Sequence, residues 1–331
     1  MISVIVCTYN QEATIGRTLD SILMQQCHAP IEIIIGEDCS TDSTGDICRR
    51  YAEQHPGTIR LFCNLQNKGV VDNYFDCLLA ASGEYIADCA GDDFWTDPLK
   101  LEKELCIMEQ HPDVTLVHTA WTSYNESLQA ALPAPRIPFT DNITHGRDML
   151  EAIVTQTRIP VVHLCTALYR RDVFLREYHA DTTMFRNKDM GCEDLQVVFV
   201  MAYNGNIAYL PDTTLNYSQG QESVSNTLDD SRQFAFVRKV TSLSHYLCSK
   251  YSISSKAVDS YFRYRVYALS MHAFRAHSRQ LLAETHDVAK MWNTEPSAKT
   301  RLLFCVMRHE WLWQLGLALR RCFVTAKRVL R

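Results

Sequence analysis

Residues 2–10 read Ile2-Ser3-Val4-Ile5-Val6-Cys7-Thr8-Tyr9-Asn10, a run that begins apolar and ends polar. Its β-branched, continuously apolar beginning is typical of a strand buried on both faces. No basic segment precedes it, and it is far shorter than the roughly 20 apolar residues that span a bilayer, so we interpret it as a strand and not as a signal peptide. Residues 15–23 then carry apolar side chains at helical spacing, with Asn10 as a candidate cap.

The alternation of strand and helix continues to residue 89. Apolar, β-strand-like runs at 31–36, 59–63 and 85–89 are separated by segments near 43–54 and 71–81 that have a helical pattern. This βαβαβαβ order predicts an α/β fold in which a mostly parallel sheet has helices on both faces. Ligands of such sheets bind beyond the carboxyl ends of the strands.

The pattern is less regular beyond Pro98. We expect alternating elements in this part: a helix to about Gln110, a strand near 115–119, a long loop at 124–146, a strand at 161–169, a helix at 193–203, a strand at 206–210 and helices from about 229 onward. Long loops inside a domain are usually functional or mobile. We divide the chain into a nucleotide-binding half at 1–118, an acceptor-binding half at 119–228 and a helical region at 229–331.

Three polar clusters stand at the ends of predicted parallel strands and are therefore expected to converge. They are Thr8-Tyr9-Asn10, Glu37-Asp38 and Gly91-Asp92-Asp93. The adjacent carboxylates of the last cluster offer the hard oxygen ligands that Mg²⁺ and Mn²⁺ prefer, and such a metal offsets charge on a leaving diphosphate. A solvated turn is the alternative for the same Gly-Asp-Asp sequence.

Single side chains near these clusters suggest contacts with a nucleotide. Asp38 is a candidate acceptor of hydrogen bonds from a base or ribose. Tyr9 is a candidate stacking platform, with core packing as the alternative. Lys68 is a candidate diphosphate ligand, with simple solvation as the alternative. We interpret Asp42 as a cap of the next helix.

Composition and missing motifs exclude several classes of protein. The net charge of -5 gives no global basic field, so we expect no nucleic-acid partner. Thirteen cysteines, an odd number without a CxxC pair, indicate reduced, mostly buried thiols in a cytoplasmic protein. The sequence has no GxGxxG after the first strand and no GxxxxGK[ST], which argues against the usual dinucleotide and P-loop sites.

Five ordered motifs in residues 3–98 resemble family 2 glycosyltransferases. They are Ser3-Val4-Ile5-Val6-Cys7-Thr8-Tyr9-Asn10 with Glu12, Glu37-Asp38-Cys39-Ser40-Thr41-Asp42, Asn67-Lys68-Gly69, Gly83-Glu84-Tyr85-Ile86-Ala87 and Gly91-Asp92-Asp93-Phe94-Trp95-Thr96-Asp97-Pro98. The last motif is similar to the Glu-Gly-Asp-Asp-Tyr-Trp segment of one bacterial branch. The resemblance weakens but continues to about residue 225.

The resemblance implies a GT-A fold, a nucleoside-diphosphate sugar donor, a divalent metal (Mn²⁺ or Mg²⁺) and inversion at the anomeric carbon. At the matching positions it implies that Asp38 contacts the base and that Asp92 binds the metal. The other residues that it places in the nucleotide-sugar site are Thr8, Tyr9, Asn10, Glu12, Lys68, Gly91 and Asp93.

The resemblance also implies a catalytic base at the start of a later helix, where Glu193-Asp194 stands and Asp194 is the closer match. An inverting transfer needs a carboxylate that takes the proton of the attacking hydroxyl. The alternative is that these acids only complement the helix dipole.

The sequence departs from the family pattern at three positions. Ala90 stands at the first acidic position of the DxD motif, and Cys39 replaces a glycine. Asn73 stands where many relatives carry a phosphate-contacting arginine. Residues 218–223 match a segment that closes over the diphosphate in relatives, with an ordinary loop as the alternative.

Basic charge is concentrated at the end of the chain. Residues 301–331 hold seven Arg or Lys and one acid, Glu310, interleaved with leucine, phenylalanine and tryptophan. This pattern predicts either peripheral contact with an anionic membrane or a helix docked on the protein. Membrane contact at the inner face of the plasma membrane would suit a lipid-linked acceptor.

We therefore predict transfer of a sugar from a UDP-type donor to a hydroxyl of a saccharide or lipid-linked saccharide, in bacterial surface polysaccharide or glycan synthesis. One alternative is a nucleotidyltransferase that makes a sugar nucleotide, although such enzymes typically carry a Gly-rich basic loop after the first strand. The other alternative is a non-catalytic module that only binds a nucleotide sugar.

Overall fold

The computed structural model describes residues 1–155, 161–219 and 227–329 and divides the chain into two compact units. Residues 1–188 and 192–221 form the N-terminal unit. Residues 189–191 and 222–331 form the C-terminal unit. The predicted half 1–118 and most of the predicted half 119–228 lie in the N-terminal unit, and the boundary proposed at residue 118 falls within strand β6 (Val114–Asn125).

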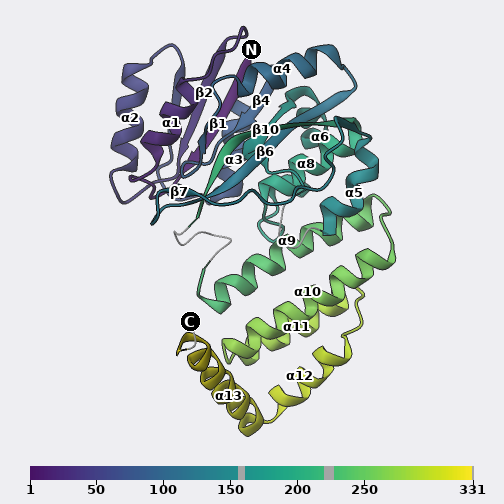
Figure 1. Ribbon diagram of the computed structural model, residues 1–331. Helices are drawn as coiled ribbons and strands as arrows, with labels where there is room; N and C mark the ends of the chain where they lie inside the picture. Colours follow the sequence, from purple (N-terminus) through teal and green to yellow (C-terminus); the bar gives the residue numbers. More distant parts are fainter. Residues whose placement is uncertain (156–160, 220–226, 330–331) are drawn as a thin grey trace. The chain divides into compact units, whose positions relative to one another are not determined.

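A single mixed sheet organises the N-terminal unit, in the order β3-β2-β1-β4-β9-β6-β10-β5, with β7 beside β6 and β8 beside β10 (Figure 1). The strands, besides β6, are β1 (Ile2–Thr8), β2 (Ile31–Glu37), β3 (Ile59–Cys63), β4 (Tyr85–Asp88), β5 (Phe94–Trp95), β7 (Ala130–Ala131), β8 (Ile143–Thr144), β9 (Ala167–Arg170) and β10 (Asn206–Gln219). The four strands β1 to β4 run parallel, as the βαβαβαβ pattern predicts. Strand β9 is antiparallel to β4 and β6, which makes the sheet mixed.

Helices cover both faces of the sheet, which is the three-layer arrangement expected for such a pattern. One face packs against α1 (Ile15–Leu23), α2 (Thr44–Gln54) and α4 (Lys100–Gln110) through a core that includes Val4, Leu19 and Leu105. Figure 1 shows α1 and α2 beside β1 and β2.

The opposite face carries α3 (Val70–Ala80), where Phe75 stacks on Phe174 and meets Phe185 edge-on. The remaining helices of the N-terminal unit are α5 (Gly146–Thr155), the 3₁₀ turn η1 (Leu164–Thr166), α6 (Arg171–Ala180), α7 (Thr182–Arg186) and α8 (Glu193–Asn204).

Four predicted elements differ from the structure. Strands β6 and β10 extend beyond the predicted 115–119 and 206–210, and β7 and β8 interrupt the predicted loop at 124–146. The predicted strand at 161–169 begins only at Ala167, after η1. A short apolar run does not distinguish a strand from a buried turn, and the polar ends of β6 and β10 lack the periodicity of a buried strand.

The expectation of mostly buried thiols is wrong. Cys48, Cys77, Cys89 and Cys248 are buried, whereas the other cysteines with described side chains are half-buried or exposed. All of these described cysteines are free thiols.

The C-terminal unit is helical, as predicted. It comprises α9 (Asp230–Lys250), α10 (Lys256–Arg275), α11 (Arg279–Met291), α12 (Ala298–Arg308) and α13 (Glu310–Val329). A capping side chain begins each of the first four helices: Asp229, Ser255, Ser278 and Ser297 accept hydrogen bonds from backbone N–H groups of the first turn.

A small core holds α10, α12 and α13 together, with Phe274, Phe304, Met307 and Trp313 buried. The Trp313 indole donates to the Phe274 carbonyl at 2.9 Å. Trp313 and Phe304 therefore belong to the protein core and not to an exposed amphipathic face. Within the described residues, no helix combines the length and the apolar character needed to cross a membrane.

Candidate active site

The carboxyl ends of β1, β2 and β4 meet at one edge of the sheet. The Asp38 N–H donates to the Thr8 carbonyl at 3.0 Å, and the Gly91 N–H donates to the Cys7 carbonyl at 3.1 Å. Asp38 and Gly91, which are 30 and 84 positions away from these partners on β1, are thereby placed beside the end of that strand. The structure brings together the three polar clusters that strand order predicts.

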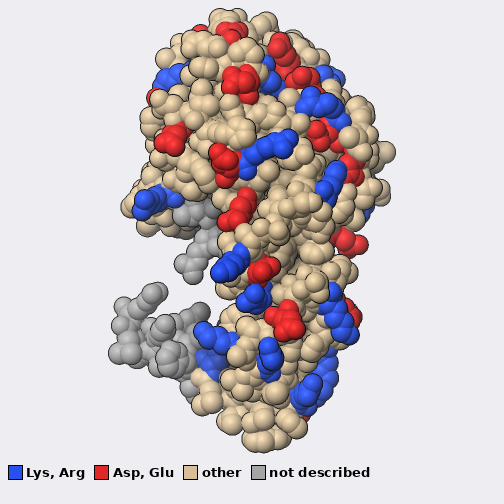
Figure 2. Space-filling view, turned by 90° about the vertical axis from the view of Figure 1, so that its right-hand side faces the viewer, with Lys and Arg blue, Asp and Glu red and all other residues tan. Residues whose placement is uncertain are grey.

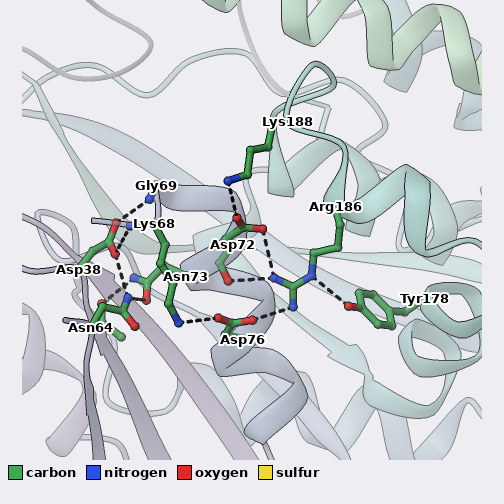
Figure 3. Close-up of polar contacts among 11 residues, drawn as sticks. Asp38, Asn64, Lys68, Gly69, Asp72, Asn73, Asp76, Tyr178, Arg186 and Lys188 are labelled. Carbon is green, nitrogen blue, oxygen red and sulfur yellow. Dashed lines mark hydrogen bonds and ion pairs between the residues drawn. The ribbon is translucent and has the colours of Figure 1, made fainter. Parts of the chain in front are cut away.

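Asp38 is buried, and its carboxylate organises the loop that follows β3 (Figure 3). It accepts hydrogen bonds from Asn64 Nδ2 at 2.8 Å, from the Lys68 N–H at 2.9 Å and from the Gly69 N–H at 2.9 Å. Because a carboxylate offers about four lone-pair positions, these bonds leave room for one more donor on Oδ2. Among the residues that the structure describes, the Gly69 N–H is the one donor to Oδ2, so this oxygen retains an accepting position.

The segment after β1 is fixed to the segment after β2, and this arrangement corrects one prediction. Asn10 has a left-handed backbone with φ of 52°, and its Oδ1 accepts from the Thr41 N–H at 2.8 Å. It does not cap α1, whose first turn follows Thr14. The Glu12 carboxylate accepts from the Ser43 N–H at 2.8 Å.

Two further side chains at this edge of the sheet are Asp42, which has its predicted capping role, and Tyr9, which is exposed. The Asp42 carboxylate accepts from the Thr44 N–H at the first position of α2, in agreement with the predicted capping role. The Tyr9 ring is 45% exposed at the end of β1. Its surface is therefore open to a stacking partner.

Lys68 is neither free nor merely solvated. Its ammonium pairs with Asp76 at 2.9 Å, and Asp76 also accepts from Arg186 at 2.8 Å (Figure 3). Arg186 comes from α7 and donates to the Asp72 carbonyl at the start of α3. Arg186 therefore contacts α3, the helix on which Asn73 stands in place of the arginine of many relatives.

Asn73 itself is buried and structural. Its Nδ2 donates to the Gly36 carbonyl at 2.8 Å, and its Oδ1 accepts from Asn64 at 2.8 Å. Since Asn64 donates to both Asn73 and Asp38, the amide of Asn73 holds the Asp38 carboxylate in place indirectly, through Asn64. The position is thus occupied by a residue that fixes the ends of β2 and β3.

Gly91 occupies a place where no side chain fits. A Cβ on this residue would lie 2.4 Å from Gln11 Oε1 and 2.8 Å from Thr8 Oγ1. The Gly91 carbonyl accepts from the Thr14 hydroxyl at 2.9 Å. Glycine therefore allows the turn before Asp92 to lie directly against the end of β1.

Asp92 and Asp93 are held differently. Ser218 Oγ and Arg17 donate to the backbone carbonyl of Asp92 at 2.5 and 3.1 Å. These bonds fix the Asp92 backbone and do not involve its half-buried carboxyl group. The Asp93 side chain is buried and accepts from the Ser218 N–H at 2.9 Å. The Asp93 side chain therefore links the turn that follows β4 to strand β10.

Burial and mutual repulsion raise the pKa of these carboxyl groups. Burial raises the pKa of Asp92, and the charge of Glu126 adds to the effect. Burial and then the charge of Asp92 raise the pKa of Asp93, with a smaller contribution from Asp194. Several carboxyl groups therefore repel one another at this edge of the sheet.

Glu193 and Asp194 lie half-buried at the start of α8. Burial raises the pKa of Asp194 to about 6. Burial, followed by repulsion from Asp194, raises that of Glu193 to about 8. The charge of Asp194 also contributes to the raised pKa values of Asp93 and Asp88. The start of α8 therefore acts electrostatically on the Gly91-Asp92-Asp93 turn.

Sequence reasoning missed several residues of the site. Arg17 forms an ion pair with Glu126 at 2.6 Å and lies 4.1 Å from the centre of the Phe94 ring. Asp88 is buried at the end of β4 near two tyrosine hydroxyl groups, Tyr74 and Tyr169, which are 2.7 Å apart. No local pattern reveals these contacts, because Arg17 and Glu126 are 109 positions apart.

The oxygen groups at the turn fit a hard divalent cation. Mg²⁺ is usually bound through one or two carboxylates together with substrate phosphates, and Mn²⁺ accepts the same kind of ligand. Asp92 supplies one carboxylate and Ala90 supplies none. Besides burial, the charge of Glu126 raises the pKa of Asp92 and that of Asp92 raises the pKa of Asp93, and a cation would offset this repulsion. The donor set therefore fits one metal ion shared with a phosphorylated ligand.

The segment predicted to close over the diphosphate is described only in part. Ser218 and Gln219 end β10, and Ser218 contacts the Asp92-Asp93 turn as above. Residues 220–223 lie outside the described residues.

The family model described as "Glycosyl transferase family 2" matches residues 3–176, which is more than half of the chain. The chain belongs to glycosyltransferase family 2. The predicted membership of this family is thereby confirmed, and the mixed sheet flanked by helices is a GT-A fold.

Two relatives illustrate the sequence similarity. The chain is 31% identical to the uncharacterized protein Rv1520 of Mycobacterium tuberculosis over 235 residues, which are 70% of this chain and 63% of that protein. The chain thus spans less than two thirds of that relative's length. It is 35% identical, over 33% of this chain and 41% of the relative, to the Escherichia coli UDP-Glc:alpha-D-GlcNAc-diphosphoundecaprenol beta-1,3-glucosyltransferase WfaP.

Two solved structures share the fold. Residues 1–349 of Staphylococcus aureus TarS, in complex with UDP-GlcNAc, align with a TM-score of 0.55 at 15% identity and cover 88% of this chain and 92% of that chain. The mannosyltransferase PcManGT of Pyrobaculum calidifontis, in complex with GDP-Man and Mn²⁺, aligns with a TM-score of 0.53 at 18% identity and covers 96% and 86%. At such low identity the likeness shows the fold alone.

Proposed function

We propose that this protein transfers a sugar from a nucleoside-diphosphate sugar to a hydroxyl group of a saccharide or lipid-linked saccharide, with inversion at the anomeric carbon. The observation that carries the proposal is the convergence of Asp38 and the Gly91-Asp92-Asp93 turn at the carboxyl ends of β2 and β4. The charge of Asp194, at the start of α8, also contributes to the raised pKa of Asp93 in this turn. Family membership and the ligands bound to TarS and PcManGT support a nucleotide-sugar donor.

The nucleotide would be held by the ends of β1 and β2. The remaining lone pair on Asp38 Oδ2 suits a ring N–H of a base such as uracil. The exposed Tyr9 ring offers a face for stacking. Thr8, Asn10, Glu12 and Gly91 act indirectly, because their contacts within the protein hold the loops in place.

The diphosphate would lie over the Asp92-Asp93 turn, where one Mn²⁺ or Mg²⁺ held by Asp92 would stabilise the charge of the leaving group. Lys68 belongs to the loop that Asp38 organises, and both Lys68 and Arg186 pair with Asp76. Direct contact of Lys68 with the diphosphate would require that this pair open.

Asp194 would act as the general base. As the acceptor oxygen bonds to the anomeric carbon and the bond from that carbon to the diphosphate breaks, the Asp194 carboxylate takes the hydroxyl proton. Its raised pKa suits a base that must hold a proton briefly near neutral pH. Glu193, one residue earlier, keeps a second carboxyl group beside it.

The direct experiment incubates the purified chain with Mn²⁺ and a panel of UDP-, GDP- and dTDP-sugars and measures release of the nucleoside diphosphate. We expect release from one donor class, most readily from UDP-sugars. Release of pyrophosphate from a nucleoside triphosphate would instead indicate a nucleotidyltransferase. Nucleotide binding without any release, with or without saccharide acceptors, would indicate a non-catalytic module.

We further propose that the C-terminal unit contacts an anionic membrane surface at the cytoplasmic face, where a lipid-linked acceptor would be available. Trp311, Leu315 and Leu319 recur at helical spacing on α13 and are 68%, 50% and 63% exposed. Arg308 and Arg320 are exposed near them. Figure 2 shows Lys and Arg predominating over Asp and Glu on the lower part of the face that it presents. Such an apolar stripe with basic neighbours suits interfacial binding.

A further inference from the structure

A cluster of metal-binding side chains lies between α4 and the segment that joins α1 to β2. Cys27, His28 and Glu102 each place one potential ligand atom within 4.8 Å of the other two. His28 Nδ1 is 2.9 Å from Glu102 Oε2, and Cys106 Sγ is 3.9 Å from Glu102 Oε1. None of these residues belongs to the candidate active site.

The cluster is held by regular structure on both sides. Glu102, Cys106 and Glu109 are four and three positions apart on α4 and therefore share one face of the helix. The Gln26 N–H donates to the Pro98 carbonyl at 2.8 Å, and Gln25 Nε2 donates to the Asp97 carbonyl at 2.8 Å. Cys27 and His28 are thus presented to α4 by a docked segment.

The ligand types select a borderline-soft ion. Two thiols, one imidazole and one carboxylate form a donor set that suits Zn²⁺, which prefers four tetrahedral ligands of sulfur, nitrogen and oxygen. In such a site neighbouring ligand atoms are roughly 3.3–3.8 Å apart, as follows from the usual Zn–S, Zn–N and Zn–O bond lengths. The separation of His28 Nδ1 from Glu102 Oε2 is slightly below this range, and that of Cys106 Sγ from Glu102 Oε1 is slightly above it. The Cys27 thiol lies within 4.8 Å of the ligand atoms of His28 and Glu102, whereas the Cys106 thiol is outside that group and would have to turn toward it on binding.

The second nitrogen of His28 already has the partner that a metal-bound imidazole needs. Nε2 lies 3.3 Å from Glu109 Oε1. Imidazoles that bind metals almost always donate their other N–H to a carboxylate, a carbonyl or water, which fixes the ring. With Nε2–H directed to Glu109, loss of the Nδ1 proton would free a lone pair for a metal ion on the side of Glu102.

We propose that Cys27, His28 Nδ1, Glu102 and Cys106 bind one Zn²⁺ ion, with Glu109 orienting the imidazole. Binding would release the protons of both thiols, because a thiolate is the ligand form of cysteine. The ion would join the α1–β2 segment to α4, the helix that directly follows the Asp92-Asp93 turn and β5. Its role would be structural, and it would be separate from the divalent metal proposed at Asp92.

The test uses the full chain in an Asp92→Asn background, stripped with a chelator, so that the proposed active-site ligand is absent. Titration with Co²⁺ as a probe should give the intense near-ultraviolet band of thiolate–cobalt bonds, and Zn²⁺ should abolish it at one equivalent. Cys27→Ser and His28→Asn should each weaken Zn²⁺ binding by at least about tenfold. Cys63→Ser, which changes an exposed cysteine elsewhere in the same unit, should have no effect.

A second readout needs no substitution. Zn²⁺ should slow alkylation of Cys27 and Cys106 by iodoacetamide and leave that of Cys63 and Cys305 unchanged, as measured by peptide mass spectrometry. The proposal is overturned if Co²⁺ gives no thiolate band, if Cys27→Ser binds Zn²⁺ as tightly as its parent, or if no cysteine of the cluster is protected. Any of these results would leave His28 with ion pairs to Glu102 and Glu109 as its only role.

Discussion

At the scale of single residues, the site separates into groups that would do chemistry and groups that hold them. Asp92, Asp194 and the open side of Asp38 belong to the first class. Gly91 and Asp93 belong to the second, because one lies against β1 and the other binds the backbone of β10. The family resemblance indicated all five positions, but only the contacts divide them between the two roles.

The protonation of Asp194 predicts how activity depends on pH. Burial raises its pKa to about 6, and a base must be ionised before it accepts a proton. We therefore expect kcat to be nearly constant well above pH 6 and to fall as pH decreases through about 6. Asp194→Asn should lower kcat by about 10²- to 10⁴-fold and remove this pH dependence while nucleotide binding persists.

The matched control is Asp172→Asn, which changes an exposed acid in the first turn of α6. It should leave kcat and its pH profile unchanged. Steady-state kinetics from pH 5 to 8 would measure both variants. A full turnover rate in Asp194→Asn would show that the base is another residue.

The close approach at Gly91 predicts a loss of stability on substitution. In Gly91→Ala the added methyl group would meet Thr8, a residue of β1 that cannot move away freely. We expect a loss of about 1–3 kcal/mol, visible in thermal unfolding, together with weaker nucleotide binding. Gly57→Ala, where a Cβ would meet nothing within 4 Å, is the control and should be nearly neutral. Equal melting temperatures for the two variants would refute the packing argument.

At the scale of elements, the first four strands were predicted within a residue or two because their apolar runs are continuous and bounded by polar turns. The ends of β6 and β10 were not predicted. Their last residues, such as Tyr124 and Tyr217, are polar or amphipathic, and β10 passes Pro211 with shifts of register. Their pairing is decided by tertiary contacts, which leave no periodic pattern in the sequence.

The same limit applies to the site. The motifs at strand ends predicted the convergence of Thr8, Asp38 and Asp92, because parallel strands place their carboxyl ends together. Arg17 and Glu126 were missed, since they meet across 109 positions of sequence, and the contact of Arg17 with Ser218 spans 201 positions. Only the folded structure shows that Arg17 and Ser218 donate to the Asp92 carbonyl and that Glu126 pairs with Arg17.

Helix α4 contains a buried ion pair that predicts a further effect on stability. Lys100 and Glu104 are fully buried, 2.7 Å apart, and Lys100 also lies 4.5 Å from the centre of the Trp95 ring. Lys100→Met should destabilise the N-terminal unit by about 3 kcal/mol, because it leaves Glu104 buried without its cation. Denaturant unfolding would measure the loss.

Lys103→Met on the same helix is the control. Lys103 pairs with Asp97 and Asp212 but is 37% exposed, so its removal should cost less than about 1 kcal/mol. A smaller loss for Lys100→Met than for Lys103→Met would contradict the importance assigned to the buried pair.

At the scale of the whole molecule, we propose that the N-terminal unit binds the donor and that the C-terminal unit attaches the protein to a membrane surface. The exposed stripe on α13 predicts binding to anionic liposomes that weakens as salt increases. Replacing Trp311, Leu315 and Leu319 by glutamine should lower liposome binding by more than about tenfold, because it removes most of the exposed apolar area. Co-sedimentation would measure the change.

The control for this prediction replaces exposed apolar residues outside the stripe, Leu128 and Met291, by glutamine. Its binding should equal that of the parent chain. If the α13 variant also sediments like the parent, the stripe is an ordinary protein surface and the membrane proposal fails.

The central claim is that Asp92 makes this edge of the sheet a metal-assisted sugar-transfer site. The most direct test compares the parent chain, Asp92→Asn and Asp113→Asn, an exposed aspartate elsewhere in the same unit, in Mn²⁺-dependent release of nucleoside diphosphate from the preferred donor. We predict at least roughly a hundredfold loss in Asp92→Asn, because several kcal/mol of leaving-group stabilisation disappear, and no loss in Asp113→Asn. Undiminished release by Asp92→Asn, with the same dependence on Mn²⁺, would contradict the claim.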